Sequence, residues 1–133
     1  MKLFGGKDLK SNLDDISNQI KDILPRMETY LKSFSQIDLD GIVGIYSPQI
    51  DNIIKATEKE YDCRFGAGRF FISTVDNEFY FLRTELYFID KSQKYYACKS
   101  ESGPQPMKHL TDSAKTELME KQEVSFDINP PKN

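Results

Sequence analysis

The residue types that most often carry out chemistry are scarce in this chain. His109 is the single histidine, and Cys63 and Cys98 are the two cysteines, all distant from one another in the sequence. A dyad of His109 with either cysteine can form only if the fold brings the pair together. No Cys-x₂-Cys or His-x₃-His spacing marks a zinc site. We therefore expect free, largely buried thiols, a solvated loop histidine, and no catalytic residue, metal or cofactor.

Glycines at one point of the chain could suggest a phosphate-binding loop. Gly66-Ala67-Gly68 has the Gly-x-Gly spacing. A loop that binds phosphate follows a strand and opens a helix, so that the helix N-terminus meets the anion. Here a predicted helix precedes the glycines and a predicted strand follows them. The segment is interpreted as a turn from helix to strand.

Arg83 and Glu85 are the most informative charged residues. They lie two apart in a predicted strand, Phe79 to Ile89, so both point to the same face. They could form an ion pair on a solvated sheet, worth about 0–1 kcal/mol. They could instead be the polar centre of a pocket or interface with aromatic walls. The same argument extends to Arg69, Tyr95 and Tyr96 on flanking strands.

Three strands with short connections are expected around this pair. Residues alternate with a period of two over Arg69–Val75, Phe79–Ile89 and Lys94–Lys99, with turn-forming residues between them. Short connections make neighbouring strands antiparallel, as in a meander. Such a sheet usually has one polar face. Aromatic residues crowd both faces here, so we expect the second face to be covered by the protein's own helices, a second copy, a partner or a small ligand.

An amphipathic heptad precedes the sheet. Its a positions are Leu13, Ile20, Met27 and Phe34, and its d positions are Leu9, Ile16, Ile23 and Tyr30. The pattern predicts a long helix from Asp8 or Ser11, bent at Pro25 or broken near 21–24. Leu24 and Leu31 widen the apolar stripe in the second half, as is typical of a helix packed on its own core. The first half could be an interface or core.

The remaining segments complete a single domain. Residues 35–47 could form a strand or a weak helical turn, and Ser47-Pro48 predicts the start of a helix to about Tyr61. After a loop over 100–110, we expect a helix from Thr111 to about Gln122 and a strand from Glu123 to Ile128. The prediction is one α+β domain over residues 1–128, with a disordered tail at 129–133. A long bent N-terminal helix and a second helix pack on an antiparallel three- to four-stranded meander, followed by a short C-terminal helix.

Composition disfavours several classes of function. The 133 residues carry a net charge of −3, and no basic cluster could neutralise several phosphates, so nucleic-acid binding is disfavoured. No run of about 18 apolar residues predicts membrane insertion. The start, Met1 to Lys7, lacks the apolar region of a signal peptide. Together with the few cysteines, this favours a cytoplasmic location.

The favoured function is a non-enzymatic protein-binding module of the adaptor, chaperone or immunity type. It would bind another protein or a second copy of itself, as a homodimer. Small acidic secretion chaperones and immunity proteins are similar in size and charge. Ile16→Asp is expected to disrupt association and leave the fold intact. The expected contact residues are Leu9, Leu13, Ile16, Ile20, Phe79, Phe81, Arg83, Glu85 and Tyr87.

The alternative is a domain that binds a small molecule or catalyses acid–base chemistry. Asp38-Leu39-Asp40 ahead of Tyr46-Ser47-Pro48 resembles, over this short stretch, the second helix of NTF2-like domains. The resemblance implies a pocket over a curved sheet. Its lining would be Arg83, Glu85, Tyr87 and Tyr96.

Overall fold

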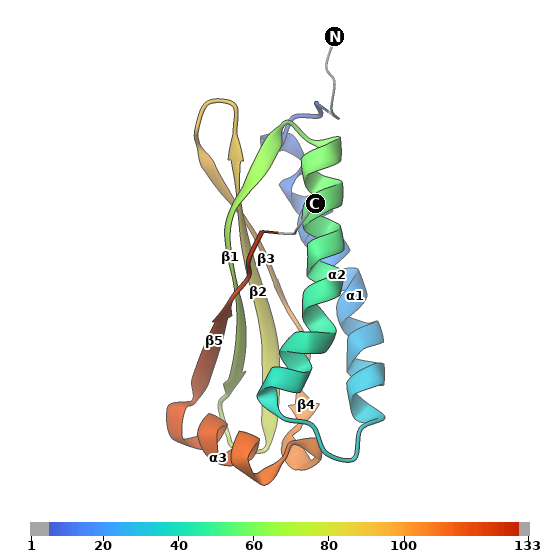
Figure 1. Ribbon diagram of the computed structural model, residues 1–133, viewed down its shortest axis with the longest axis vertical. Coiled ribbons are helices and arrows are strands. Elements are labelled where there is room, and N and C mark those ends of the chain that lie inside the picture. The colour runs from blue at the N-terminus through green and yellow to red at the C-terminus, as the bar shows by residue number, and fades with distance from the viewer. Residues whose placement is uncertain (1–5, 131–133) are drawn as a thin grey trace.

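A computed structural model describes residues 6–130 of the chain. Three α-helices pack on an antiparallel sheet whose strands run in the order β3-β2-β1-β5, with the short β4 paired to β2 (Figure 1). The predicted α+β class, with a long first helix and a short last one, is confirmed. The elements in chain order are η1 (Lys10–Asn12), α1 (Leu13–Lys32), α2 (Leu39–Glu60), β1 (Cys63–Thr74), β2 (Phe79–Asp90), β3 (Tyr95–Glu101), β4 (Gln105–Pro106), η2 (Met107–His109), α3 (Asp112–Lys121) and β5 (Glu123–Asp127).

Helix α1 is continuous through Pro25, which is exposed. Water can therefore solvate the Lys21 carbonyl, to which the proline ring offers no N–H. A straight helix turns every 3.6 residues and drifts away from a 3.5-residue heptad. The drift brings Leu24 into the core and leaves Tyr30 55% exposed. The buried residues of the helix are Ile16, Ile20, Leu24, Met27 and Leu31.

Helix α2 begins at Leu39, so the prediction of a start at Ser47-Pro48 was wrong. The Asp38 side chain caps the helix, because its Oδ1 accepts the Gly41 N–H at 2.6 Å. Pro48 is interior but exposed. An interior proline costs about 3 kcal/mol, whereas each large apolar side chain buried contributes about 1.5–3 kcal/mol. The first part of the helix buries Leu39, Ile42 and Tyr46, which outweighs the proline.

Strand β1 begins at Cys63 and contains both glycines of Gly66-Ala67-Gly68, so the predicted turn is wrong. The register with β2 shifts between Phe65 and Ala67, which marks a bulge. A Cβ on Gly66 would lie 2.9 Å from Ile89 Cδ1. Glycine here lets the bulged backbone lie directly over that side chain.

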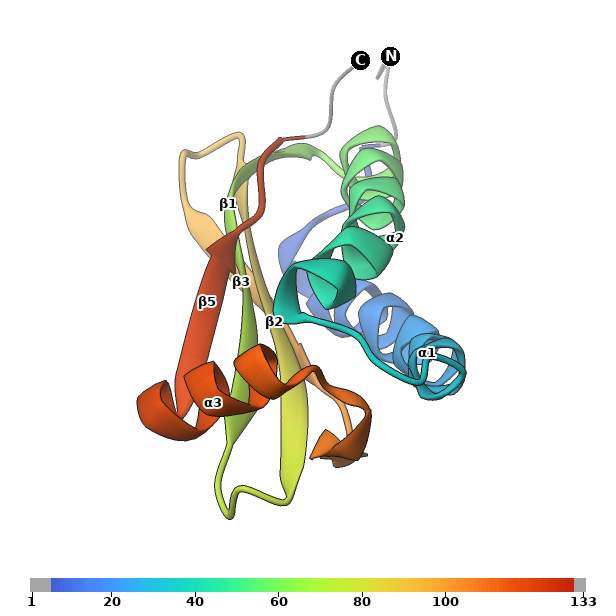
Figure 2. The same cartoon turned by 60° about the horizontal axis from the view of Figure 1, so that its bottom comes forward.

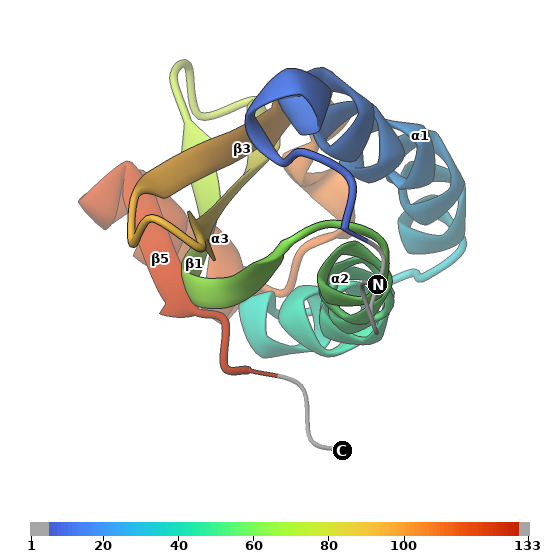
Figure 3. The same cartoon turned by 90° about the horizontal axis from the view of Figure 1, so that it is seen from above.

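The core lies between the sheet and helices α1 and α2, which occupy the same side of it (Figures 2 and 3). Alternate residues of β2, such as Leu82 and Leu86, are fully buried on this inner face. Phe70 of β1 stacks on Tyr46 of α2 with ring centroids 4.3 Å apart. The buried Ala114 and Leu118 of α3 belong to the same core.

The first half of the heptad lies within this core. Leu9 is 2% exposed, Ile16 and Ile20 are fully buried, and the partly buried Leu13 packs against them. These four residues hold α1 on its own sheet. The expectation that Ile16→Asp spares the fold is therefore revised, because a buried unpaired charge is strongly destabilising.

Truncation of Ile16 should lower the stability of the chain itself. Ile16→Ala is expected to reduce the free energy of unfolding by about 2–5 kcal/mol, because it leaves a cavity under α1. The exposed neighbour Asn18 is the control, and Asn18→Ala should change stability by no more than about 0.5 kcal/mol. Urea denaturation followed by circular dichroism measures both. Equal stability of the two variants would contradict this placement of Ile16.

Candidate functional site

The outward face of the sheet, opposite the helices, carries aromatic and charged side chains together. Five residues expected at a binding site lie on it: Phe79, Phe81, Arg83, Glu85 and Tyr87 all come from alternate positions of β2. Their neighbours across the strands are Arg69, Phe71 and Ser73 of β1, and Ala97, Lys99 and Glu101 of β3. Phe79 is 38% exposed, and Tyr95 near the hairpin end is 65% exposed.

Arg83 joins three strands on this face. Its guanidinium carbon lies 4.1 Å from the centroid of the Phe71 ring, a cation–π contact. Its Nε lies 3.4 Å from Glu85 Oε2, and its Nη2 lies 3.7 Å from Glu123 Oε2. The Tyr87 hydroxyl donates to Glu85 Oε1 at 3.1 Å. Arg83 and Glu85 thus belong to a network that also includes aromatic side chains.

A row of alternating charge crosses the middle of the face. Arg69 lies opposite Asp127 on one side and Glu85 on the other, and Glu85 lies opposite Lys99. We call Asp127, Arg69, Glu85 and Lys99 the charge row; its signs are −, +, −, +. Arg69 Nε lies 3.3 Å from Asp127 Oδ1. Aromatic side chains flank the row on both sides along the strands.

The structure separates the other predicted site residues from this face. Leu9, Leu13, Ile16 and Ile20 lie on the inner side of the sheet, in the core. Tyr96 pairs with the inward Phe88 and packs against the same core, so it shares no cavity with Arg83, Glu85 and Tyr87. The candidate site consists of the β2 residues and their neighbours. Phe71, Lys99 and Asp127 were missed because only the strand register places them opposite Arg83, Glu85 and Arg69, respectively.

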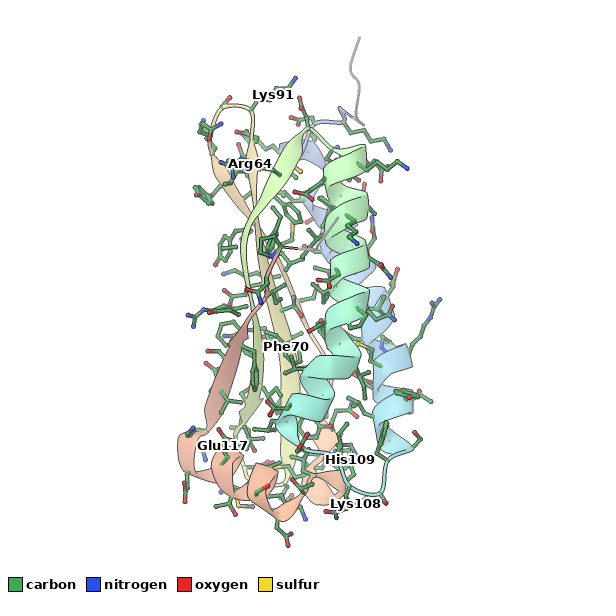
Figure 4. The ribbon with its side chains drawn as sticks, viewed as in Figure 1. Arg64, Phe70, Lys91, Lys108, His109 and Glu117 are labelled. Carbon is green, nitrogen blue, oxygen red and sulfur yellow. The ribbon has the colours of Figure 1, made fainter. Side chains whose placement is uncertain are left out.

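His109 is 7% exposed, so the prediction of a solvated loop histidine was wrong. Its Nε2 and the Tyr80 hydroxyl form a hydrogen bond of 2.5 Å. Burial, with smaller contributions from Lys32 and Lys108, lowers the pKa of His109. The histidine lies at the α3 end of the molecule (Figure 4). Its carbonyl accepts the Ile37 N–H at 2.9 Å, which ties the α1–α2 loop to the segment before α3.

Neither cysteine forms a dyad with His109. Cys63 lies opposite Asp90 at one end of β2, and His109 contacts Tyr80 at the other end. Cys98 lies opposite Leu86, about 20 Å along the strand from Tyr80 at about 3.3 Å per residue.

The thiols themselves are poorly suited to nucleophilic chemistry. Burial raises the pKa of Cys63 to about 12 and that of Cys98 to about 11, so both are protonated at neutral pH. Among residues 6–130, no group of three or more His, Cys, Asp and Glu side chains could hold a metal ion. Within the same range, no helix has the length and apolar character needed to cross a membrane.

Two open grooves lie beside α1. One, of about 500 Å³, separates α1 from α2, and Arg26 is the single charged residue of its lining. The second, of about 490 Å³, lies between α1 and the end of β3 and includes Lys21 and Lys99. The inner face of the sheet is filled by core side chains such as Tyr46, Phe70 and Tyr80.

Burial of His109 should make stability depend on pH. A histidine whose pKa is lower in the folded state binds a proton more readily when unfolded, so stability is full above about pH 6.5 and falls as pH drops below it. The loss ends below the folded-state pKa and has a slope of at most about 1.4 kcal/mol per pH unit. His109→Gln should lack this contribution.

Urea unfolding of both proteins at pH 7.5 and pH 5.5 measures the difference. Carboxylates titrate mainly below this range, and their contribution is common to the two proteins. Identical pH dependence in wild type and variant would contradict the assignment.

Comparison with known proteins identified no relative of this chain. No protein-family model, no curated protein and no solved structure matches this chain. The function proposed for it accordingly rests on the geometry described above.

Proposed function

We propose that this protein is a non-enzymatic protein-binding module that docks its partner on the outward face of the sheet. The observation that carries the proposal is the aromatic and charged surface of β2 and its neighbours, on the side of the sheet opposite α1 and α2. Antiparallel sheets usually present a polar face to water. Here Phe71, Phe81 and Tyr87 are only half-buried by their own neighbours.

The composition of the face supports a protein partner. Interface cores are enriched in tyrosine, phenylalanine and arginine, and the residues that dominate binding energy are most often tryptophan, tyrosine and arginine. Tyr87 and Arg83 lie near the middle of the face, each hydrogen-bonded or ion-paired to Glu85.

The rigidity of the face also supports binding. It is built on a hairpin of two 12-residue strands, paired along almost their whole length. A preformed surface loses little conformational entropy when it binds.

A binding role also fits the state of the groups that could do chemistry. The single histidine is buried against Tyr80, and both cysteines have raised pKa values. An enzyme acting through general acid–base or thiol chemistry needs such groups accessible to substrate and with a pKa near the working pH.

Matched tyrosine truncations on opposite sides of the molecule test the proposal. Tyr87→Ala removes an aromatic residue from the outward face, and Tyr30→Ala removes one from the surface of α1. If Tyr87 anchors the partner, its truncation should weaken binding by about 30-fold, corresponding to about 2 kcal/mol, and Tyr30→Ala should bind as wild type does.

The partner is first identified by affinity purification with the wild-type chain, and its binding is then measured by calorimetry with all three proteins. Equal binding to Tyr87→Ala and wild type would contradict the proposal. So would a wild-type chain that retains no partner and remains monomeric.

A further inference from the structure

We propose that a second copy of this chain packs face to face on the outward sheet face, with a two-fold axis parallel to the strands and running between β1 and β2. The inference rests on the proposed function and names the partner. It follows from the sign pattern of the charge row and from the side-chain sizes in the rows beside it.

The charge row is antisymmetric about the line between β1 and β2. From β5 to β3 its members are Asp127, Arg69, Glu85 and Lys99, in direct register. Reversing the order of the strands exchanges positive and negative positions throughout. A sheet face with this property is complementary to its own reversed copy.

Only one orientation of the second copy uses this property. A two-fold axis parallel to the strands reverses their order, so that Arg69 faces Glu85 of the second copy and Lys99 faces its Asp127. An axis across the strands would instead place each charge over the same charge, and this like-charge repulsion disfavours that arrangement. In an isologous interface every favourable contact occurs twice.

The neighbouring rows are complementary in the same orientation. Ala67 lies opposite Tyr87, and Ser73 lies opposite Phe81, so the axis places a small side chain of one copy against a large one of the other. Between the charge row and the row of Ser73 and Phe81, Phe71 lies opposite Arg83, and their cation–π contact within one chain would be repeated between chains. Because sheets twist by about 20–25° per strand, the facing side chains of the two copies are best aligned along the two-fold axis.

The sheet edge at the start of β1 is partly occupied by a helix side chain. At the start of β1, the Glu58 carboxylate of α2 accepts the Phe65 N–H at 2.8 Å. This side chain occupies a backbone donor that an added strand would need. At β3, α1 packs on the inner side of the sheet, where the Ser100 hydroxyl donates to the Ser17 carbonyl at 2.8 Å.

The size of the face indicates a reversible dimer. At about 3.3 Å per residue and about 4.8 Å between strands, β1, β2, β3 and β5 project about 570 Å². Stable complexes bury about 800 Å² of accessible surface per partner. We expect Kd on the order of 10–100 µM, with the aromatic rows providing affinity and the charge row fixing orientation.

Charge reversal with rescue between chains tests the proposal. Arg69→Glu and Glu85→Arg should each raise the Kd of self-association at least about tenfold, because each places like charges opposite one another twice. An equimolar mixture should recover association close to that of wild type, since Glu at 69 of one chain then faces Arg at 85 of the other. No effect within a single chain can produce this recovery. Sedimentation velocity between 10 and 500 µM measures all four samples.

A second pair and a control complete the experiment. Lys99→Glu and Asp127→Lys, both at exposed positions, should each weaken self-association, and an equimolar mixture of the two should recover it. This second pair keeps the test valid if circular dichroism shows that Glu85→Arg does not fold. Lys55→Glu, exposed on α2, should associate as wild type does.

A monomeric wild type at 500 µM, or a dimer that survives both reversals, would overturn the second-copy assignment. The general binding proposal has its own readout in Tyr87→Ala: a monomer that still loses a different partner on this truncation retains the function and refutes only the dimer.

Discussion

The contact between the inner side chains of the β1–β2 hairpin and the two long helices is the constraint on which the rest of the molecule depends. Phe70 stacks on Tyr46, whose hydroxyl is hydrogen-bonded to Thr84, so one helix residue fixes both central strands. Because side chains alternate across a strand, a slip of one residue would exchange the two faces completely. Burial of the inner set therefore also determines which residues point outward and in which register their charges meet.

The exposed helix prolines and the buried polar contacts near α3 are compatible with this packing. Pro25 within α1 and Pro48 within α2 both face water, where the missing backbone N–H is least costly. At the α3 end, Tyr80 and His109 share a buried hydrogen bond, and backbone bonds from Ile37 and Thr111 join the α1–α2 loop to the segment before α3. The histidine is thus used to hold segments of the fold together, and the proposed binding surface lies elsewhere, on the outward sheet face.

Local patterns predicted the long first helix, the three meander strands and the last strand, since periodicity and turn residues decide these elements. The start of α2 was not predictable from Ser47-Pro48, because burial of Leu39, Ile42 and Tyr46 outweighs the local proline signal. A heptad such as Leu9 to Ile20 has the same spacing in a core and in an interface, so only the fold could assign it to the core. Strand parity identified Phe81, Arg83, Glu85 and Tyr87 as neighbours. The positions of Phe71 and Lys99 beside them, and of Asp127 beside Arg69, depend on long-range register, which a single strand does not encode.

The Glu58 carboxylate at the start of β1 has a consequence for how copies of this chain can accumulate. An open strand edge lets chains add one after another without limit, as in amyloid fibres, whereas a face related to itself by a two-fold axis is used up once two copies meet. By occupying the Phe65 N–H, the helix side chain hinders open-ended growth at that edge. In the proposed dimer, association through the aromatic sheet face would therefore end at two copies, while growth at the start of β1 is hindered.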